Sequence, residues 1–347
     1  MIAVVTGSSG FIGSHLVDAL LERGATVRVL ARPESAESAL DPRVQRWRAD
    51  LADERSVRAA GVWEGATHVF HLAGATKRRT LGQFRFANVV PTANVLAAAA
   101  AHAGSAPPRV VLVSSQAAAG PARSADHPVR EDDAPTPIEG YGRSKLEAET
   151  AARPYEGRLP VSIVRPAAVY GPRDRDFLRV FKLASRPVAI HAVPRDNAFS
   201  VVHVRDVVAG ILLAGERPES IGRTYFLANE SPVTWRAMYE AIASAASATR
   251  LLELQLPLPA IALAGAAGDV VSALTGLHSL ANGNKTRLAR PRWWLCDAGR
   301  ARDELGWRPS VGLQQGVRDT YLWYVNAGWM RAHAPRTGTA PSEETPA

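Results

Sequence analysis

The feature that most constrains the fold of this chain is a glycine-rich turn between a strand-like and a helix-like segment within residues 1–32. The apolar run MIAVVTG predicts a buried strand, and FIGSHLVDALLERG has a helical period that stops at Gly24. The run TVRVLAR (26–32) predicts a second strand. A strand, a helix and a strand in this order imply parallel strands joined by a right-handed crossover.

The glycines of the turn are spaced as G-x-x-G-x-x-G within TGSSGFIG. Glycine lets the backbone turn tightly and approach a pyrophosphate, and the N-terminus of the following helix favours the negative charge of that group. This context predicts a dinucleotide site, and a tight turn without a ligand is the alternative. The residues expected to contact the dinucleotide here are Gly7, Ser9, Gly10, Phe11, Ile12 and Gly13.

Strand-like and helix-like segments continue to alternate along the first half of the chain. Apolar runs at 67–74, 109–115 and 161–171 predict further strands, with helix-like stretches between them. The expected fold class is α/β, a Rossmann doubly wound parallel sheet with a smaller C-terminal substrate lobe. The expected parts are a dinucleotide-binding domain at 1–171, to which 198–228 returns, a substrate lobe at 172–197 and 229–295, a closing segment at 296–331 and a disordered tail at 332–347.

Composition narrows the class of partner. The formal net charge is +8, but the arginines are scattered and acids lie between them, so no nucleic-acid partner is expected. Cys296 is the only cysteine, which excludes an internal disulfide and favours reducing, cytoplasmic surroundings. The apolar stretch 256–277 is interrupted by Pro257, Pro259 and Asp269. It predicts a helix over the substrate or a weak membrane-surface contact, and no transmembrane segment.

The end of the second predicted strand bears on the choice of dinucleotide. An NAD site usually carries an acid there, which binds the ribose hydroxyls of the adenosine. This strand ends instead in VLAR, and Arg32 could pair with a 2′-phosphate through a bidentate contact, while strand alternation could turn Arg28 away. The sequence favours NADP(H), with NAD(H) possible. Arg32 as a solvated surface arginine is the alternative.

Two later loops are also expected at the dinucleotide. Asp50 follows the strand-like run VQRWRAD and could accept a hydrogen bond from adenine, although alone it would be an ordinary loop aspartate. The small residues of HLAGAT let the dinucleotide lie close to the chain, and His71 is interpreted as a packed structural histidine. The residues expected to contact the dinucleotide in these loops are Asp50, Leu51, Leu72, Ala73 and Gly74.

The segment YGRSK carries the expected proton chemistry. Tyr141 and Lys145 are four residues apart, so on a helix they share one face. A neighbouring ammonium favours the phenolate, which would let Tyr141 exchange a proton near neutral pH. Ser115, at the end of a predicted strand, could hold the same substrate oxygen. The alternative is a chance spacing on a solvated helix, although only four lysines occur in the chain. No metal site is expected.

Taken together, the motifs resemble the extended short-chain dehydrogenase/reductase superfamily, of the NAD-dependent epimerase/dehydratase type. The matching segments are TGSSGFIG, DL at 50–51, HLAG, NVVPTAN at 88–94, SSQAAAG, YGRSK, RPAAVYGP at 165–172 and VHVRDV at 202–207. The resemblance implies that Ser115 is the catalytic serine and Tyr141 the acid/base. It also implies that Lys145 lowers the pKa of the tyrosine and that Tyr141 and Lys145 contact the dinucleotide, with Lys145 on the nicotinamide ribose.

Further positions follow from the resemblance. Asn88 lies where the family's N-x-x-G-T-x-N helix begins. Arg165 and Pro166 resemble the strand whose end meets the nicotinamide amide, and Ala167 and Ala168 come next. Pro91 replaces the glycine of the helix motif, and proline is tolerated only in a first helical turn or at a kink.

The branch of the family is read from smaller features. The strand VRVLAR and the stretch RPAAVYGPRDRD are similar to dihydroflavonol-reductase-like and 3β-hydroxysteroid-dehydrogenase-like members. Segments typical of UDP-galactose-type epimerases are missing at 165–172 and before VVHV. The apolar 254–277 segment suits a lipophilic substrate. The basic loop ATKRRT (75–80) could face an acidic substrate group or be solvated.

The expected function is therefore an NAD(P)H-dependent oxidoreductase that reduces a carbonyl or oxidises the matching alcohol of a small molecule. One alternative is a nucleotide-sugar epimerase or dehydratase with tightly bound NAD, and another is a non-catalytic dinucleotide-binding subunit. A homodimer is also expected, formed through the alanine-rich face of 93–103 and the helix after Tyr141.

Overall fold

The fold is that of a computed structural model, described for residues 1–32, 41–104, 106–186, 188–191, 193–248, 252–257 and 291–332. Most of the tail expected at 332–347 and most of the apolar stretch 256–277 lie outside these residues.

The centre of the fold is a parallel sheet of seven strands in the order β11-β6-β5-β4-β1-β2-β3. The chain winds outward from β1 in both directions, because β1 pairs with β2 on one side and with β4 on the other. Sheets of this kind bind ligands outside the carboxyl ends of the strands where the winding reverses. The predicted doubly wound sheet is thus confirmed. Its strands are β1 (Ile2–Thr6), β2 (Thr26–Ala31), β3 (Gln45–Arg48), β4 (His68–His71), β5 (Arg109–Val113), β6 (Val161–Pro166) and β11 (Thr224–Leu227).

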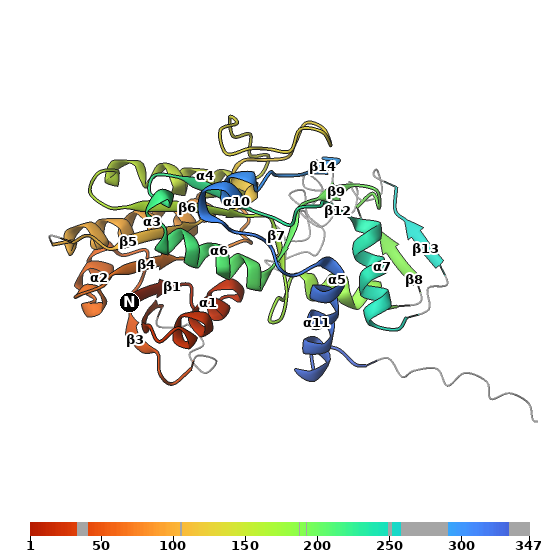
Figure 1. The fold of residues 1–347 in the computed structure, drawn as a ribbon, viewed down its shortest axis with the longest axis horizontal. Helices are drawn as coiled ribbons and strands as arrows, with labels where there is room; N and C mark the ends of the chain where they lie inside the picture. Colours follow the sequence, from red (N-terminus) through yellow and green to blue (C-terminus); the bar gives the residue numbers. More distant parts are fainter. Residues whose placement is uncertain are drawn as a thin grey trace, which may run out of the picture.

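Helices cover both faces of this sheet (Figure 1). Helices α1 and α6 pack together on one face, and α2, α3 and α4 pack on the other. On α1 the buried residues Leu16, Val17 and Leu20 form one apolar stripe toward the sheet. The bounds of these helices are α1 (Phe11–Glu22), α2 (Glu54–Ala59), α3 (Leu81–Ala101), α4 (Gly140–Thr150) and α6 (Val204–Glu216); the short 3₁₀ helices are η1 (Gly61–Trp63), η2 (Gln116–Ala118), η3 (Arg153–Tyr155) and η4 (Pro218–Ser220).

The apolar run at 161–171 forms two strands instead of the single one expected. β6 ends at Pro166, and β7 (Ala168–Tyr170) leaves the large sheet to pair with β10 (Val201–His203). The backbone changes partner within two residues, because the Ala167 amide donates to Leu227 of β11 while the Ala168 amide donates to Ser200. The strand therefore leads the chain out of the sheet toward the second part of the molecule.

The second part of the molecule has its own apolar cluster, on the right in Figure 1. Helices α5, α7 and α11 supply Phe181, Met238, Ile242 and Tyr324 to this cluster, all fully buried. α11 lies in the expected closing segment, yet it packs against α7. The elements here are α5 (Phe177–Ala184), β8 (Val188–His191), β9 (Ala198–Phe199), β12 (Val233–Thr234), α7 (Trp235–Ala245), β13 (Leu252–Gln255), β14 (Trp293–Trp294) and α11 (Leu313–Asn326). Helix α10 (Gly299–Leu305) packs instead on β11 and α6 beside the large sheet.

Helix α3 differs from the expectation for Pro91. The helix begins at Leu81, capped by the Thr80 side chain, so Pro91 lies in the middle of it and not in its first turn. Proline has no amide hydrogen, and the carbonyl of Ala87 therefore loses its helical partner. Beside it, the Thr92 hydroxyl donates to the Asn88 carbonyl at 2.7 Å. Of the two placements expected for Pro91, the one in a first helical turn was wrong, and the one at a kink stays a prediction.

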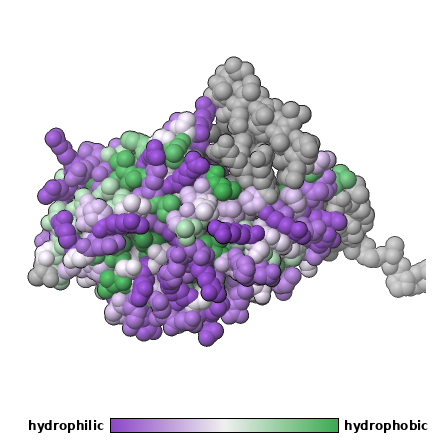
Figure 2. Space-filling model, turned by 90° about the horizontal axis from the view of Figure 1, so that it is seen from above, coloured by the Kyte–Doolittle hydropathy of each residue, from purple (hydrophilic) through white to green (hydrophobic). Residues whose placement is uncertain are grey.

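The surface is largely hydrophilic on the face shown in Figure 2, where the apolar side chains form small separate groups. No helix of the described residues is long and apolar enough to cross a membrane. The large apolar side chains that are exposed come from separate elements: Met1, Phe86, Leu183, Ile221, Leu254, Leu256 and Leu322.

Candidate active site

The glycine turn after β1 is held by close backbone contacts that only glycine allows. Gly7 has a φ of 72°, and a Cβ there would lie 2.7 Å from the Ala73 amide nitrogen. A Cβ on Gly13 would lie 2.1 Å from the Gly7 carbonyl oxygen. Gly10 is the N-cap of α1, and no side chain of the described residues caps this helix. Its first amide groups are therefore free to bind an anion, as a pyrophosphate site requires.

A cavity of about 330 Å³ opens beside this turn at the carboxyl edge of the sheet. Its volume falls within the range of small-molecule sites. Nine of the residues predicted to contact the dinucleotide line it: Gly7, Ser9, Gly10, Arg32, Asp50, Leu51, Leu72, Ala73 and Gly74. The glycine turn, the uncapped helix and the cavity together fit a bound dinucleotide.

The sequence did not indicate the other half of the cavity wall. Part of this wall comes from the N-terminal half of α3, where Phe86 is 61% exposed and Ala87 and Pro91 lie on the same side. Arg78 also lines the cavity, although its loop had been interpreted as facing the substrate or the solvent. The lining residues that were missed are Ser8, Leu30, Ala31, Ala52, Ala75, Arg78, Phe86, Ala87 and Pro91. The signals that could have indicated them were Pro91 in the NVVPTAN motif and the small residues of HLAGAT, which include Ala75.

Charged side chains are unevenly placed around the cavity. The lining residues include two basic side chains, Arg32 and Arg78, and one acidic side chain, Asp50. Arg28 points away, as strand alternation suggested, and donates to the carbonyl oxygens of Val62 and Glu64. In the same loop as Arg78, Lys77 forms an ion pair with Asp176. The loop therefore bridges the cavity wall and the segment that leads into α5.

The remaining predicted dinucleotide contacts lie outside this cavity: Phe11, Ile12, Gly13, Asn88, Tyr141, Lys145, Pro166 and Ala168. Phe11 packs edge-on against His15 at 5.9 Å between ring centroids. Asn88 is buried and accepts from the Ala75 amide at 2.6 Å, while its own amide donates to the Ser144 hydroxyl at 2.8 Å. Asn88 therefore ties the loop after β4 to α4.

His71 is buried at the end of β4, between two hydroxyl groups. Its ring nitrogens are hydrogen-bonded to Thr6 Oγ1 at 2.7 Å and to Thr92 Oγ1 at 3.0 Å. Burial and, to a smaller extent, the charge of Lys145 together lower the pKa of His71 to about 3. The residue has the environment of a packed structural histidine.

Ser115, Tyr141 and Lys145 come together at the carboxyl end of β5. Ser115 is the N-cap of η2, and its side chain is hydrogen-bonded to the Tyr141 hydroxyl. Lys145 is buried, and its Nζ donates to the Val113 carbonyl oxygen at 2.7 Å. The preceding serine, Ser114, donates instead to the carboxylate of Glu149. Of the two adjacent serines, Ser115 is thus the one directed at the tyrosine.

The pKa of Tyr141 differs from the expectation. Burial raises the pKa of Tyr141 to about 12, the hydrogen bond with Ser115 lowers it, and the negative charge of Glu139 raises it. Lys145 is not among the groups that shift the pKa of Tyr141, and its ammonium donates to the Val113 carbonyl. In this site the phenol keeps its proton well above neutral pH.

Helix α4 is fixed in place at the residues around Tyr141. The Glu139 carboxylate caps the helix by accepting from the amides of Tyr141 and Gly142, each at 2.5 Å. A Cβ on Gly142 would lie 2.2 Å from the Ala117 carbonyl oxygen, so α4 and η2 touch backbone to backbone. This contact sets the separation between Ser115 and Tyr141.

A doubly wound sheet that offers a dinucleotide cavity and gathers a serine, a tyrosine and a lysine at one edge is characteristic of the extended short-chain dehydrogenases/reductases, a class of NAD-dependent enzymes. The model of the NAD dependent epimerase/dehydratase family matches residues 3–228. The chain belongs to this family.

Several known proteins are similar over nearly the whole chain. A ceramide reductase of Caulobacter vibrioides (strain NA1000 / CB15N) is 32% identical over 95% of this chain and 96% of that protein. A 4-hydroxy-2-methyl-3-oxo-4-farnesyl-3,4-dihydroquinoline-1-oxide ketoreductase of Stigmatella aurantiaca is 31% identical over 90% of this chain and 93% of that protein. Among solved structures, the UDP-glucose 4-epimerase of Thermus thermophilus in complex with NAD has a TM-score of 0.74 and 23% identity, covering 94% of this chain and 100% of that one. At this identity the likeness is one of fold.

Proposed function

We propose that the protein is an NAD(P)H-dependent reductase that reduces a carbonyl group of a lipophilic small molecule, or oxidises the matching alcohol. The observation that carries this proposal is the hydrogen bond between Ser115 and Tyr141 beside the buried Lys145. These groups lie at the same edge of the sheet as the dinucleotide cavity. A bound nicotinamide would supply the hydride, which leaves proton transfer and charge stabilisation to the chain.

Each side chain has a distinct part in this reaction. Tyr141 donates its phenolic proton to the carbonyl oxygen as negative charge develops there. Ser115 donates a hydrogen bond to the same oxygen and stabilises the developing charge. Lys145 contributes its positive charge to the site, and its hydrogen bond to Val113 fixes where that charge lies.

The protonation state of Tyr141 favours reduction over alcohol oxidation at neutral pH. Burial raises the pKa of Tyr141 to about 12, so the phenol is protonated when the carbonyl arrives. Reduction consumes that proton, whereas alcohol oxidation requires the phenolate. A protonated phenol is therefore the competent form for carbonyl reduction.

The substrate class rests on the relatives and on composition. The two relatives described above, both more than 30% identical, are named for the reduction of a ceramide and of a farnesyl-bearing quinoline. Both molecules carry long hydrocarbon chains. The stretch 256–277 of this chain is rich in apolar residues, which suit contact with a hydrocarbon chain. We propose an aldehyde or ketone that bears such a chain.

We further propose NADP(H) as the preferred cofactor. Arg32 stands at the end of β2, where NAD sites usually carry an acid, and Arg78 lines the same cavity. Two guanidinium groups can bind a 2′-phosphate through charge-assisted hydrogen bonds.

The reaction is tested by mixing the purified protein with NADPH and a panel of long-chain ketones and aldehydes, and following loss of NADPH absorbance. Tyr141→Phe is expected to lower kcat/KM by about 10²–10⁴-fold, and Ser115→Ala by about 10²–10³-fold. Both variants should bind NADPH with the affinity of the parent protein. Unchanged turnover in Tyr141→Phe would reject the proposal.

The alternative function is a nucleotide-sugar epimerase or dehydratase, the activities for which the matching family is named. Such an enzyme keeps NAD tightly bound and regenerates it in each cycle. Identification of the nucleotide released from denatured protein separates the two functions. Stoichiometric NAD with no net change in its redox state during turnover would favour the epimerase.

A further inference from the structure

Three buried charged side chains, Lys145, Glu149 and Arg165, lie on α4 and the neighbouring strand β6. Glu149 lies one helical turn beyond Lys145 on α4, and its carboxylate accepts two hydrogen bonds from Arg165 of β6, at 3.0 and 2.7 Å. A third hydrogen bond to this carboxylate comes from the Ser114 hydroxyl. The side chains of Arg165 and Glu149 are only 8% and 7% exposed.

The charges in this group alternate in sign along α4 and β6. Lys145 and Arg165 are buried cations, and the Glu149 carboxylate, which binds Arg165, lies one helical turn from Lys145. Arg165 also lies over the ring of Phe226, at 5.6 Å from the ring centroid. A buried cation is costly unless a charge of opposite sign compensates it. Replacing Glu149 with glutamine would leave two buried cations facing a neutral carboxamide.

We infer that Glu149 is a positioning residue that keeps Lys145 in its charged form and thereby sets the pH above which the reductase loses activity. This inference rests on the proposed function, because Lys145 matters only where Tyr141 transfers a proton. Glu149 itself does not touch the substrate or the dinucleotide.

The electrostatic surroundings of Lys145 support this role. Burial lowers the pKa of Lys145 to about 8, and the negative charge of Glu149 opposes that effect. The other titratable or charged groups on the elements packed here are Tyr141 on the same helix, His71 on β4, whose pKa the charge of Lys145 lowers, and Arg165 on β6, which binds Glu149. His71 is neutral, because burial lowers its pKa to about 3. Tyr141 is neutral as well, so Glu149 supplies the compensating anion.

The test follows Lys145 directly in full-length protein labelled with ¹³C at the lysine side chains. The chain has only four lysines, so the spectrum is simple, and Lys145→Arg assigns the signal. Glu149→Gln is expected to lower the pH midpoint of the Lys145 signal by about one unit or more, a tenfold change in its dissociation constant. Arg165→Met, which removes the competing cation, is expected to shift the midpoint in the opposite direction.

Activity provides the second readout. The high-pH loss of kcat should move to lower pH in Glu149→Gln, and Glu149→Asp, which keeps the charge, should restore the parent profile. Glu147→Gln is the matched control, because Glu147 lies on the same helix and pairs with Arg85 at the surface. In Glu147→Gln, the pH midpoint of the Lys145 signal and the pH profile of kcat should both equal those of the parent protein.

The inference fails if Glu149→Gln leaves the Lys145 midpoint unchanged. Should that variant not fold, an unchanged or lowered midpoint in Arg165→Met overturns the inference instead. The Lys145 titration does not depend on turnover, so its failure is distinct from failure of the proposed reaction. The latter would appear as full activity in Tyr141→Phe.

Discussion

At the scale of single side chains, the two ends of the candidate site use opposite electrostatic environments. At the end expected to hold the adenosine, Arg32 and Arg78 are exposed to solvent and line an open cavity. At the end expected to hold the nicotinamide, Lys145 is buried and Tyr141 is half-buried, and loss of solvent is the largest cause of the pKa shift at both. The first environment suits recognition of a charged ligand, and the second suits controlled proton transfer.

Arg78 is expected to distinguish NADPH from NADH. Arg78→Gln should raise the dissociation constant of NADPH by roughly tenfold to a hundredfold, the usual range for a lost charge-assisted hydrogen bond. The dissociation constant of NADH should stay almost unchanged. Dissociation constants measured from the fluorescence of the reduced nicotinamide give both values. Lys77→Gln is the control, because Lys77 lies in the same loop but pairs with Asp176. Equal weakening of both nucleotides by Arg78→Gln would refute the role.

At the scale of elements, the site depends on how closely α4 approaches η2. Gly142→Ala is expected to push the two apart, because the added methyl group would meet the Ala117 carbonyl oxygen at 2.2 Å. We expect a loss of about 1–3 kcal/mol in the free energy of unfolding, measured in urea, and a fall in kcat as Ser115 separates from Tyr141.

Gly82→Ala provides the matched control for this prediction. Gly82 lies in the first turn of α3, where the nearest atom to an added Cβ is Thr80 Oγ1 at 3.9 Å. Alanine favours a helix over glycine by about 1 kcal/mol, so this variant should be equally or more stable and fully active. If both variants behave alike, the contact between α4 and η2 does not set the geometry of the site.

The elements also differ in how far the sequence could predict them. The strands and α1 have local patterns of apolar residues and glycines, and these patterns were enough to predict the sheet and the turn at Gly7. The start of α3 was missed although Thr80 and Gln83 carry a capping signal, with the Gln83 amide donating to Thr80 Oγ1. The break between β6 and β7 has no local signal, because its cause is pairing with the distant β10.

The candidate site was predictable only in part, for a similar reason. Residues at strand ends meet at one edge of a parallel sheet, so the strand pattern was enough to bring Asp50, Leu72 and Ser115 to that edge. Phe86 and Ala87 reach the cavity through the packing of α3 on the sheet, which a sequence period does not fix. The pKa of Tyr141 depends on its burial, and that too is a tertiary property.

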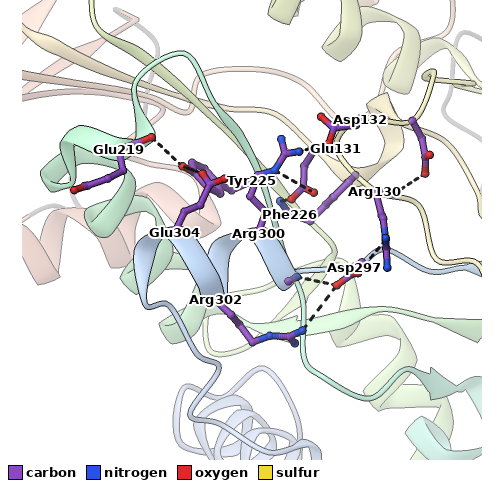
Figure 3. Close-up of polar contacts among 12 residues, drawn as sticks. Arg130, Glu131, Asp132, Glu219, Tyr225, Phe226, Asp297, Arg300, Arg302 and Glu304 are labelled. Carbon is purple, nitrogen blue, oxygen red and sulfur yellow. Dashed lines mark hydrogen bonds and ion pairs between the residues drawn. The ribbon is translucent and has the colours of Figure 1, made fainter.

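At the scale of the whole molecule, the C-terminal segment supports the loop between Ser115 and Tyr141. Figure 3 shows Glu131 of this loop between Arg300 of α10 and the backbone of Phe226 in β11. The chain after α10 is in turn held by Asp206 of α6. The Asp206 backbone carbonyl accepts a hydrogen bond from the Trp307 indole, and its carboxylate accepts one from the Ser310 hydroxyl. Residues far apart in sequence thus fix the path of the loop that leads into α4.

Of the residues in this network, Glu131 is the one whose substitution should lower the activity of the candidate site. Its side chain is 4% exposed and accepts from the Phe226 amide at 2.8 Å. Glu131→Ala would leave that buried amide without its partner, which costs about 1–3 kcal/mol of unfolding free energy, and would loosen the loop before Tyr141. We expect lower stability in urea together with a lower kcat.

Asp132 provides the control for this prediction, because its substitution also removes a charge next to Arg300 but leaves the Phe226 contact in place. Asp132 also pairs with Arg300, but its side chain is 84% exposed. Exposed ion pairs contribute about 1 kcal/mol or less, so Asp132→Asn should change stability little and leave kcat intact. A large loss in Asp132→Asn, or none in Glu131→Ala, would mean that the exposed charges and not the buried backbone contact hold the loop, and that α10 supports the site through its surface.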